Sequence, residues 1–375
     1  MPYLTYFDVV EHLITSSFGG PQDAEQRDIR TAVQRAYQEL TTMRDWSYYH
    51  VHGRIITQEP YTTGSIYTAN TSVELVGGTL PTWAATGAYI KANNEIARVE
   101  SRASNTALQT DSAIRFKGTL SNQSYALYRT VYPLPSDFRN LDEPSDEYNW
   151  RAGHYITPDE AMKLERVSNS SGEPYHWTII KDPDSTGWAL KIVGYPTRQE
   201  TIDFTYRRSA RPIRYSGHEA SASNGTISAL TAAVVSGFGT SFSSDMAGSI
   251  LRLGTASSSP GASASLTPFL SEHRIKAANG SVMDIAPAVY IPEDTKYLIT
   301  DPIDIPPHMH NCMYSAAEYW LARIRNNKPE AAFAMYQRDL RLAMEQDQLA
   351  PLSGRSQEIW HDGGWKSPLN ADRGT

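Results

Sequence analysis

Two pairs of histidines have the spacing most suited to metal chemistry in this sequence. His50 and His52 would share one face of a strand, as zinc ligands often do, and His308 and His310 repeat the spacing. Neither pair has a third cysteine, histidine or carboxylate nearby in an evident metal pattern. The sequence therefore predicts no metal site and no bound cofactor.

A group of four carboxylates is the next candidate for ion binding, formed by Asp142, Glu143, Asp146 and Glu147. It lacks the ordered spacing of a calcium loop. A solvated loop, or a set of charge partners for arginines elsewhere, is the favoured interpretation.

Motifs of the common enzyme classes do not occur. The sequence has no phosphate-binding loop, GxSxG elbow, HExxH helix or dinucleotide fingerprint. Paired carboxylates for glycoside hydrolysis stay open, because they can come from distant strands. We therefore predict no catalytic residues and no enzyme activity. A glycan-cleaving enzyme stays open as a third functional class that no motif supports.

The densest basic stretch contains Arg207, Arg208, Arg211 and Arg214. Such arginines suit contact with an acidic neighbouring subunit or with DNA phosphate. Alternatively, these arginines are solvent-exposed charges at a strand edge that prevent the edge from pairing with another chain, and the pattern is equally consistent with this role.

Bulk composition excludes several classes. The 375 residues are 40% hydrophobic and 20% charged, with a formal net charge of −7, which disfavours a protein that coats nucleic acid. A negative wall would still let DNA slide past. The single cysteine, Cys312, rules out intrachain disulfides. No stretch has the length of a membrane span and the first residues lack a signal pattern, so we expect a soluble chain that is not secreted.

Helical periodicity marks both ends of the chain. Residues 1–50 carry apolar stripes on two expected helices, the first opened by Thr5 and Asp8 as an N-cap pair. Residues 297–349 predict a helical hairpin, with Pro306 and Pro307 at its start and Pro329 opening its second helix. Its two expected apolar stripes consist of Met309, Met313, Ala317, Trp320 and Ile324, and of Ala332, Phe333, Tyr336, Leu340 and Ala343. The two chain ends are expected to close one helical bundle.

The middle of the chain has the period of strands. We divide it into a first β module at 51–135, a helix-plus-strand region at 136–216 with a helix capped from Thr157, and a second β module at 217–296. The second module is rich in Ser, Ala and Gly. The spacing from Gly78 to Gly87 is repeated from Gly239 to Gly248, which favours two related modules over one module and a linker. The fold class is α+β, with a helical bundle, a central antiparallel sheet and two small β-barrel or sandwich inserts.

Residues 350–375 lose all periodicity, and a terminus of this kind is usually disordered unless something ties it down. Trp360 and Trp365 stand out in this polar segment. Large aromatic residues dominate many interfaces, so these two are interpreted as contacts for a partner, against the alternative that they pack back on their own domain.

The order of these signals resembles the head-to-tail connector (adaptor) proteins of tailed bacteriophages, the family of the tubular tail protein A. Four stretches carry the resemblance: RAYQELTTMRDWSYY, SYALYRTVYPLPSDF, the strands YHWTIIKDP, ALKIVGYPT and IDFTYRRSARPI, and YLITDPIDIPPHMHNCMYSAAEYWLARI. Together they cover most of the chain. The β insert at 217–285 departs from the simplest members and leaves the place in the virion less certain.

The resemblance implies a structural virion protein that forms a ring, typically a dodecamer, beneath the portal in the neck of the tail. It implies assembly in the host cytoplasm, tail tube or nozzle proteins as further partners, and genomic DNA that passes through the channel without sequence-specific binding. It also assigns residues 350–375 to an extended C-terminal arm that docks on the portal, through Leu352, Ile359, Trp360, Trp365 and Leu369. The alternative is a tail fibre or a host-surface (glycan) binding virion protein built on the β modules.

Overall fold

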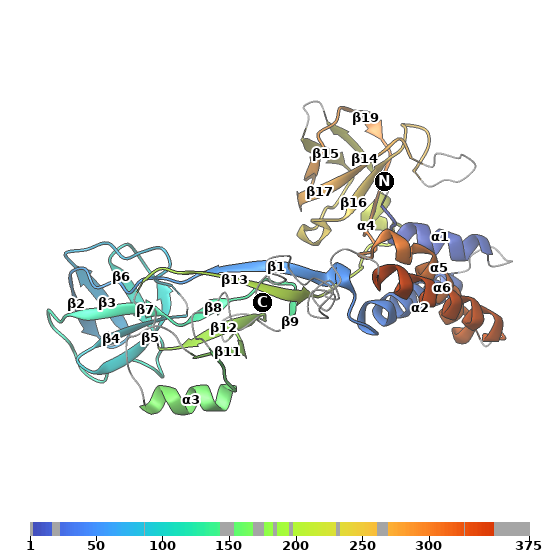
Figure 1. Ribbon diagram of the computed structural model, residues 1–375. Coiled ribbons are helices and arrows are strands. Elements are labelled where there is room, and N and C mark those ends of the chain that lie inside the picture. Colours follow the sequence, from blue (N-terminus) through green and yellow to red (C-terminus); the bar gives the residue numbers. More distant parts are fainter. Residues whose placement is uncertain are drawn as a thin grey trace, which may run out of the picture. The chain divides into compact units, whose positions relative to one another are not determined.

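The computed structural model describes residues 3–16, 23–85, 87–142, 154–167, 176–182, 186–194, 198–229, 233–260, 269–325 and 327–348. These residues form a mixed helix-and-sheet fold with two compact units (Figure 1). The first unit combines the chain up to Tyr48 with the chain from Ala210 onwards, and the second contains Tyr49–Ser209. The predicted arm at 350–375 lies outside the described residues. Among the described helices, none is long and apolar enough to span a bilayer.

Four helices of the first unit pack against one another, although they come from opposite ends of the sequence (Figure 1). They are α1 (Tyr6–Ser16), α2 (Asp23–Thr42), α5 (His310–Ile324) and α6 (Glu330–Gln348). Their buried residues follow the helical period, as in Ile29, Val33, Ala36 and Leu40 of α2. The chain also has the short helices η1 (Ser47–Tyr49), η3 (Pro307–Met309) and α4 (Ala220–Ser223), of which η3 contacts α5 and α6.

The helix start at Thr5 has the predicted capping geometry. The backbone amide and the hydroxyl of Thr5 donate to the Asp8 carboxylate at 3.0 and 2.8 Å, and the amide of Asp8 donates to the Thr5 hydroxyl at 3.4 Å. The same reciprocal bonds join Thr157 and Glu160 at the start of α3 (Pro158–Val167). Both caps depend on neighbours three residues apart, which is why the sequence predicts them.

The stripe predicted for the second helix of the hairpin is narrower than expected. Tyr336 and Ala343 are buried, whereas Phe333 is 39% exposed. Helix α6 therefore packs against the unit along one thin line of side chains and leaves other apolar residues at the surface.

The rest of the first unit is a curled antiparallel sheet in the order β19-β14-β15-β18-β17-β16-β20. Its strands are β14 (Thr226–Ala229), β15 (Val234–Phe238), β16 (Ile250–Leu253), β17 (Ser271–Asn279), β18 (Val282–Ala286), β19 (Ile291–Thr295) and β20 (Tyr297–Thr300), with η2 (Ser244–Met246) between β15 and β16. Strands β19 and β20 follow one another directly and pair with opposite edges, β14 and β16, so the sheet closes on itself. Residues 297–300, which the sequence division places with the helical hairpin, belong to this sheet because their β-branched and aromatic side chains fill its interior.

The second unit contains another curled antiparallel sheet, in the order β2-β3-β6-β5-β4-β7. Its strands are β2 (Ser65–Ala69), β3 (Ser72–Val76), β4 (Ala88–Ala92), β5 (Glu95–Arg102), β6 (Ala107–Thr110) and β7 (Tyr125–Arg129). Reciprocal backbone hydrogen bonds of 2.9 and 3.1 Å between Ile66 and Gln123 join its two edges. The edges of both curled sheets are thus paired within the chain.

Two smaller sheets complete the second unit and share one apolar core. One has the order β1-β13-β9, from β1 (His50–Ile56), β13 (Thr201–Arg208) and β9 (Phe138–Leu141). The other has the order β10-β11-β12-β8, from β10 (His154–Tyr155), β11 (His176–Lys181), β12 (Trp188–Val193) and β8 (Val131–Pro133). Trp177, Ile192, Phe204 and Tyr206 are among their common core residues. The pairing of β1 with β13 joins segments that the sequence division separates.

The two curled sheets correspond strand for strand. If the strands of each sheet are numbered from its own first strand, and β19 and β20 are counted as one strand, both sheets have the order 1-2-5-4-3-6. In both sheets, strand 6 also pairs with strand 1. Each also has a bulge at the same place between strands 4 and 5, at Val99–Ser101 in one and at Ile275–Ala277 in the other.

Glycines at the open end of each first hairpin extend the correspondence. Gly64 and Gly225 have φ of 85° and 86°, and a Cβ on either would come within 2.4 Å of the facing backbone carbonyl oxygen, of Val76 or of Phe238. The opposing glycines are Gly77 and Gly239. Gly239 therefore corresponds to Gly77 rather than to Gly78, one residue away from the match that spacing suggests.

In each sheet, a tyrosine of the last strand donates a hydrogen bond to the residue that precedes the first hairpin. The hydroxyl of Tyr125 donates to the carbonyl oxygen of Thr63 at 2.9 Å, and the hydroxyl of Tyr297 donates to that of Asn224 at 2.7 Å. Thr63 and Asn224 each precede the hairpin glycine. Burial raises the pKa of both tyrosines, to about 12 for Tyr297.

Candidate interaction sites

The arm residues assigned to portal docking, namely Leu352, Ile359, Trp360, Trp365 and Leu369, lie outside the described residues. Their docking role stays a prediction. The four arginines predicted as subunit contacts are described, and they fall in both units.

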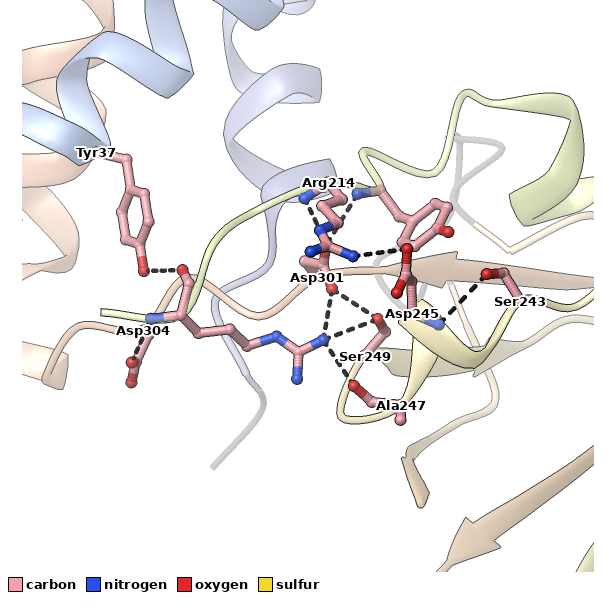
Figure 2. A network of polar contacts seen from close by, with 10 residues as sticks. Tyr37, Arg214, Ser243, Asp245, Ala247, Ser249, Asp301 and Asp304 are labelled. Carbon is pink, nitrogen blue, oxygen red and sulfur yellow. Dashed lines mark hydrogen bonds and ion pairs between the residues drawn. The ribbon is translucent and has the colours of Figure 1, made fainter. Parts of the chain in front are cut away.

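Arg211 lies in a polar network centred on Asp301, at the point where the chain re-enters the first unit (Figure 2). One guanidinium nitrogen of Arg211 lies 3.0 Å from the Asp301 carboxylate, and the same nitrogen donates to the Ala247 carbonyl oxygen at 3.0 Å. The backbone carbonyl of Arg211 accepts a bond of 2.7 Å from the Tyr37 hydroxyl, and its amide donates to Asp304. The guanidinium group of Arg211 is therefore bound within its own unit.

Asp301 itself is almost completely buried, with 1% of its side chain exposed. Its carboxylate accepts hydrogen bonds from the amides of Arg214 and Tyr215 at 2.6 and 2.8 Å and from the Ser249 hydroxyl at 2.6 Å (Figure 2). A buried charge is tolerated when its oxygens are satisfied in this way. Asp301 ties the returning segment to the curled sheet, a role that the sequence analysis missed because its partners are 52 to 90 residues away.

The remaining predicted arginines have separate surroundings. Arg214 pairs with Asp245 at 2.7 Å, and both side chains are more than half exposed. Arg207 and Arg208 end strand β13 in the other unit, where the guanidinium carbon of Arg208 lies 5.3 Å from the ring centre of Tyr49. Two of the four arginines thus belong to each unit, and a role in subunit contact stays a prediction for them.

No described residues complete a metal site around either histidine pair. His50 lies 2.8 Å from the Asp142 carboxylate, while His52 is exposed. Burial lowers the pKa of both His308 and His310, opposed at His308 by the charge of Asp347. No group of three or more metal-ligating side chains occurs in the described part of the chain. Of the acidic group, only Asp142 is described.

A buried ion cluster anchors the start of α1 to the curled sheet of the first unit. Arg252, with 3% of its side chain exposed, binds both oxygens of Asp8 at 2.6 and 2.8 Å and lies 2.9 Å from Glu272. Asp8 thus caps the helix and pairs with the arginine at once. A bidentate arginine–carboxylate pair holds one geometry tightly, so the helix and the sheet are fixed together.

An aromatic and basic cluster lies where α2, α5 and α6 meet. The Trp320 indole nitrogen donates to Glu39 at 2.6 Å, and the Tyr336 hydroxyl donates to the same carboxylate at 3.2 Å. The guanidinium carbons of Arg35 and Arg323 lie 5.5 and 4.9 Å from the centre of the Trp320 ring. Sequence periodicity places Trp320 in an apolar stripe, whereas in the structure it is half-buried, with its indole N–H bound to Glu39 and two guanidinium groups over its ring.

The outer side of α6 carries an apolar stripe that nothing in the described chain covers. Ala331, Met335 and Leu342 follow one another at helical spacing and are exposed, with Met335 and Leu342 at 48% each. Arg338 lies between Met335 and Leu342 along this face, so one charged residue interrupts the stripe, and Glu345 follows at its end.

Cys312 is buried on α5, and burial raises the pKa of its thiol to about 12. This environment suits an inert core thiol rather than a nucleophile.

Comparison with known proteins gives no identity: no protein-family model matches the chain, and no curated protein matches it.

Proposed function

We propose that this chain is a head-to-tail adaptor of a tailed bacteriophage, a structural protein that forms a ring beneath the portal and continues the DNA channel. The observation that carries the proposal is the uncovered stripe Ala331, Met335 and Leu342 on α6. A ring needs one surface of each subunit to meet a different surface of the next, at every step around the axis. An apolar helix face at the edge of a helical layer suits that contact.

The packing of α1 and α2 against α5 and α6 supports the architecture that goes with this function. In it, the two chain ends form a helical bundle that buttresses the channel, and the arm reaches the portal. The buried links of Arg252 with Asp8 and of Asp301 with Arg211 favour a bundle held rigidly on its own β domain.

The two curled sheets are, on this proposal, copies of one barrel module inserted twice into the adaptor. Their shared strand order, bulge position, paired glycines and tyrosine hydrogen bonds support a common origin. The β modules would then meet tail proteins.

The exposed side of the second module favours an alternative, a tail-fibre or host-surface (glycan) binding role. Val234 and Phe238 on β15 and Val282 on β18 are exposed apolar residues on neighbouring strands. A trimer that binds cell envelopes would support this alternative, and a ring that binds the portal would exclude it.

Charged substitutions on α6 test the proposed function. In the double variant Met335→Glu/Leu342→Glu, we expect the chain to fold with an unchanged helical signal but to lose association with portal rings by more than tenfold, because apolar contact area disappears and two charges are introduced. The matched control Ala334→Glu/Gln337→Glu places the same charges on exposed positions of α6 outside the stripe. Sedimentation with purified portal measures the association. Equal binding by both variants would contradict the proposal.

A further inference from the structure

Opposite sides of α5 differ in charge. On the side that faces α1, Glu318 lies 2.7 Å from His12, and the neighbouring Glu11 lies 3.3 Å from His218. The two carboxylates are about one-third exposed. With histidine counted as neutral, as in the formal charge of the chain, this acidic face carries two negative charges.

The other side of α5 is basic and aromatic. Arg35 and Arg323 are exposed and lie over the ring of Trp320, and among the described residues neither forms an ion pair with a carboxylate. Glu39, one turn after Arg35 on α2, uses its oxygens for Trp320 and Tyr336 instead. Two cations therefore sit on an aromatic surface and face solvent.

Helical geometry sets these two faces apart. Glu318 and Trp320 are two positions apart on α5, which is about 200° around a helix of 3.6 residues per turn. A contact between opposite sides of successive subunits is the kind that generates a ring. Tryptophan and arginine are also the residues most often found at the energetic centre of an interface.

We infer that the basic face of one copy (Arg35, Trp320 and Arg323) docks on the acidic face of the next copy (Glu11 and Glu318). The occupant of the basic face is thus a second copy of this chain, chosen by charge complementarity between the two faces. The inference rests on the proposed ring and adds a charged contact between subunits to the apolar contact proposed for α6. DNA phosphate is the competing occupant.

A mixing experiment with full-length chains tests the pairing directly. Variant one carries Arg35→Glu/Arg323→Glu, so both its faces are acidic; variant two carries Glu11→Arg/Glu318→Arg, so both its faces are basic. Each variant alone juxtaposes like charges at every contact, and we expect ring assembly on portal to fall on the order of tenfold or more. An equimolar mixture restores opposite charges at every contact of an alternating ring, and we expect assembly within about twofold of wild type. Mass photometry with portal present gives the readout.

The control Arg274→Glu/Lys276→Glu reverses two exposed charges on β17, outside both faces, and should assemble normally. Restoration in the mixture also shows that both variants are folded. If wild type assembles and the mixture does not recover, the inference is wrong while the proposed function stands. The inference is equally wrong if each variant assembles alone, or if variant one assembles normally and loses only DNA binding. If the wild-type chain does not assemble on the portal, the proposed function is itself wrong, and the inference that depends on it is wrong as well.

Discussion

Asp301 shows how one buried carboxylate organises a junction between distant segments. Its oxygens accept from two backbone amides, one hydroxyl and one guanidinium (Figure 2). Its position directly after strand β20 invites no prediction from sequence, because the next residue is a proline and the partners are remote in the chain. Local signals are more informative: three-residue spacing predicts the caps at Thr5 and Thr157, and both are confirmed.

Replacing Asp301 by asparagine tests this junction. The amide nitrogen of Asp301→Asn would face donors, and Arg211 would lose its charge partner, so we expect the free energy of unfolding to fall by about 3 kcal/mol. Urea unfolding of the full chain measures the loss. The control Asp203→Asn removes an exposed carboxylate paired with Arg54 and should change the midpoint little. Equal effects from the two variants would rule out a special role for Asp301.

At the scale of elements, the sequence predicts helices and strands well and their pairing poorly. Apolar periodicity locates α2 and α5. The pairing of β1 with β13 joins His50 to Arg207, and no local pattern encodes a match across that length of chain. Likewise, spacing alone aligns Gly239 with Gly78, whereas cross-strand contact aligns it with Gly77.

The start of α5 predicts a dependence of stability on pH. Burial lowers the pKa of His308 and His310 in the folded chain below their ordinary value of about 6.5. As the pH falls below that value, the unfolded chain binds protons that the folded chain refuses, so this stability is present above about pH 6.5 and declines as the pH falls towards the lowered pKa values.

The variant His308→Gln/His310→Gln removes both titrating groups and should lose less stability than wild type between about pH 7.5 and 5.5. Thermal unfolding at the two pH values, followed by circular dichroism, gives the comparison. An unchanged pH dependence in the variant would show that these histidines are not responsible.

At the scale of the whole molecule, the sequence indicates an α+β chain, and the structure has a mixed helix-and-sheet fold with two curled antiparallel sheets. The units divide differently from the sequence segments, because the first unit is assembled from both ends of the chain. The surfaces that matter for assembly are hidden from sequence reasoning. Trp320 and Phe333 both fit an apolar period, and only the packing of α6 shows which side chains stay outside.

The most direct test of the proposed adaptor role is a cryo-electron microscopy reconstruction of the full-length chain bound to the portal of its own phage. We predict a ring of copies beneath the portal, with α6 of each copy against the next and with residues 350–375 in contact with the portal. A chain truncated at Pro351 should keep its fold and lose this association. A reconstruction in which the portal stays bare, or a map of the virion that places the chain away from the junction of capsid and tail, would contradict the proposed role.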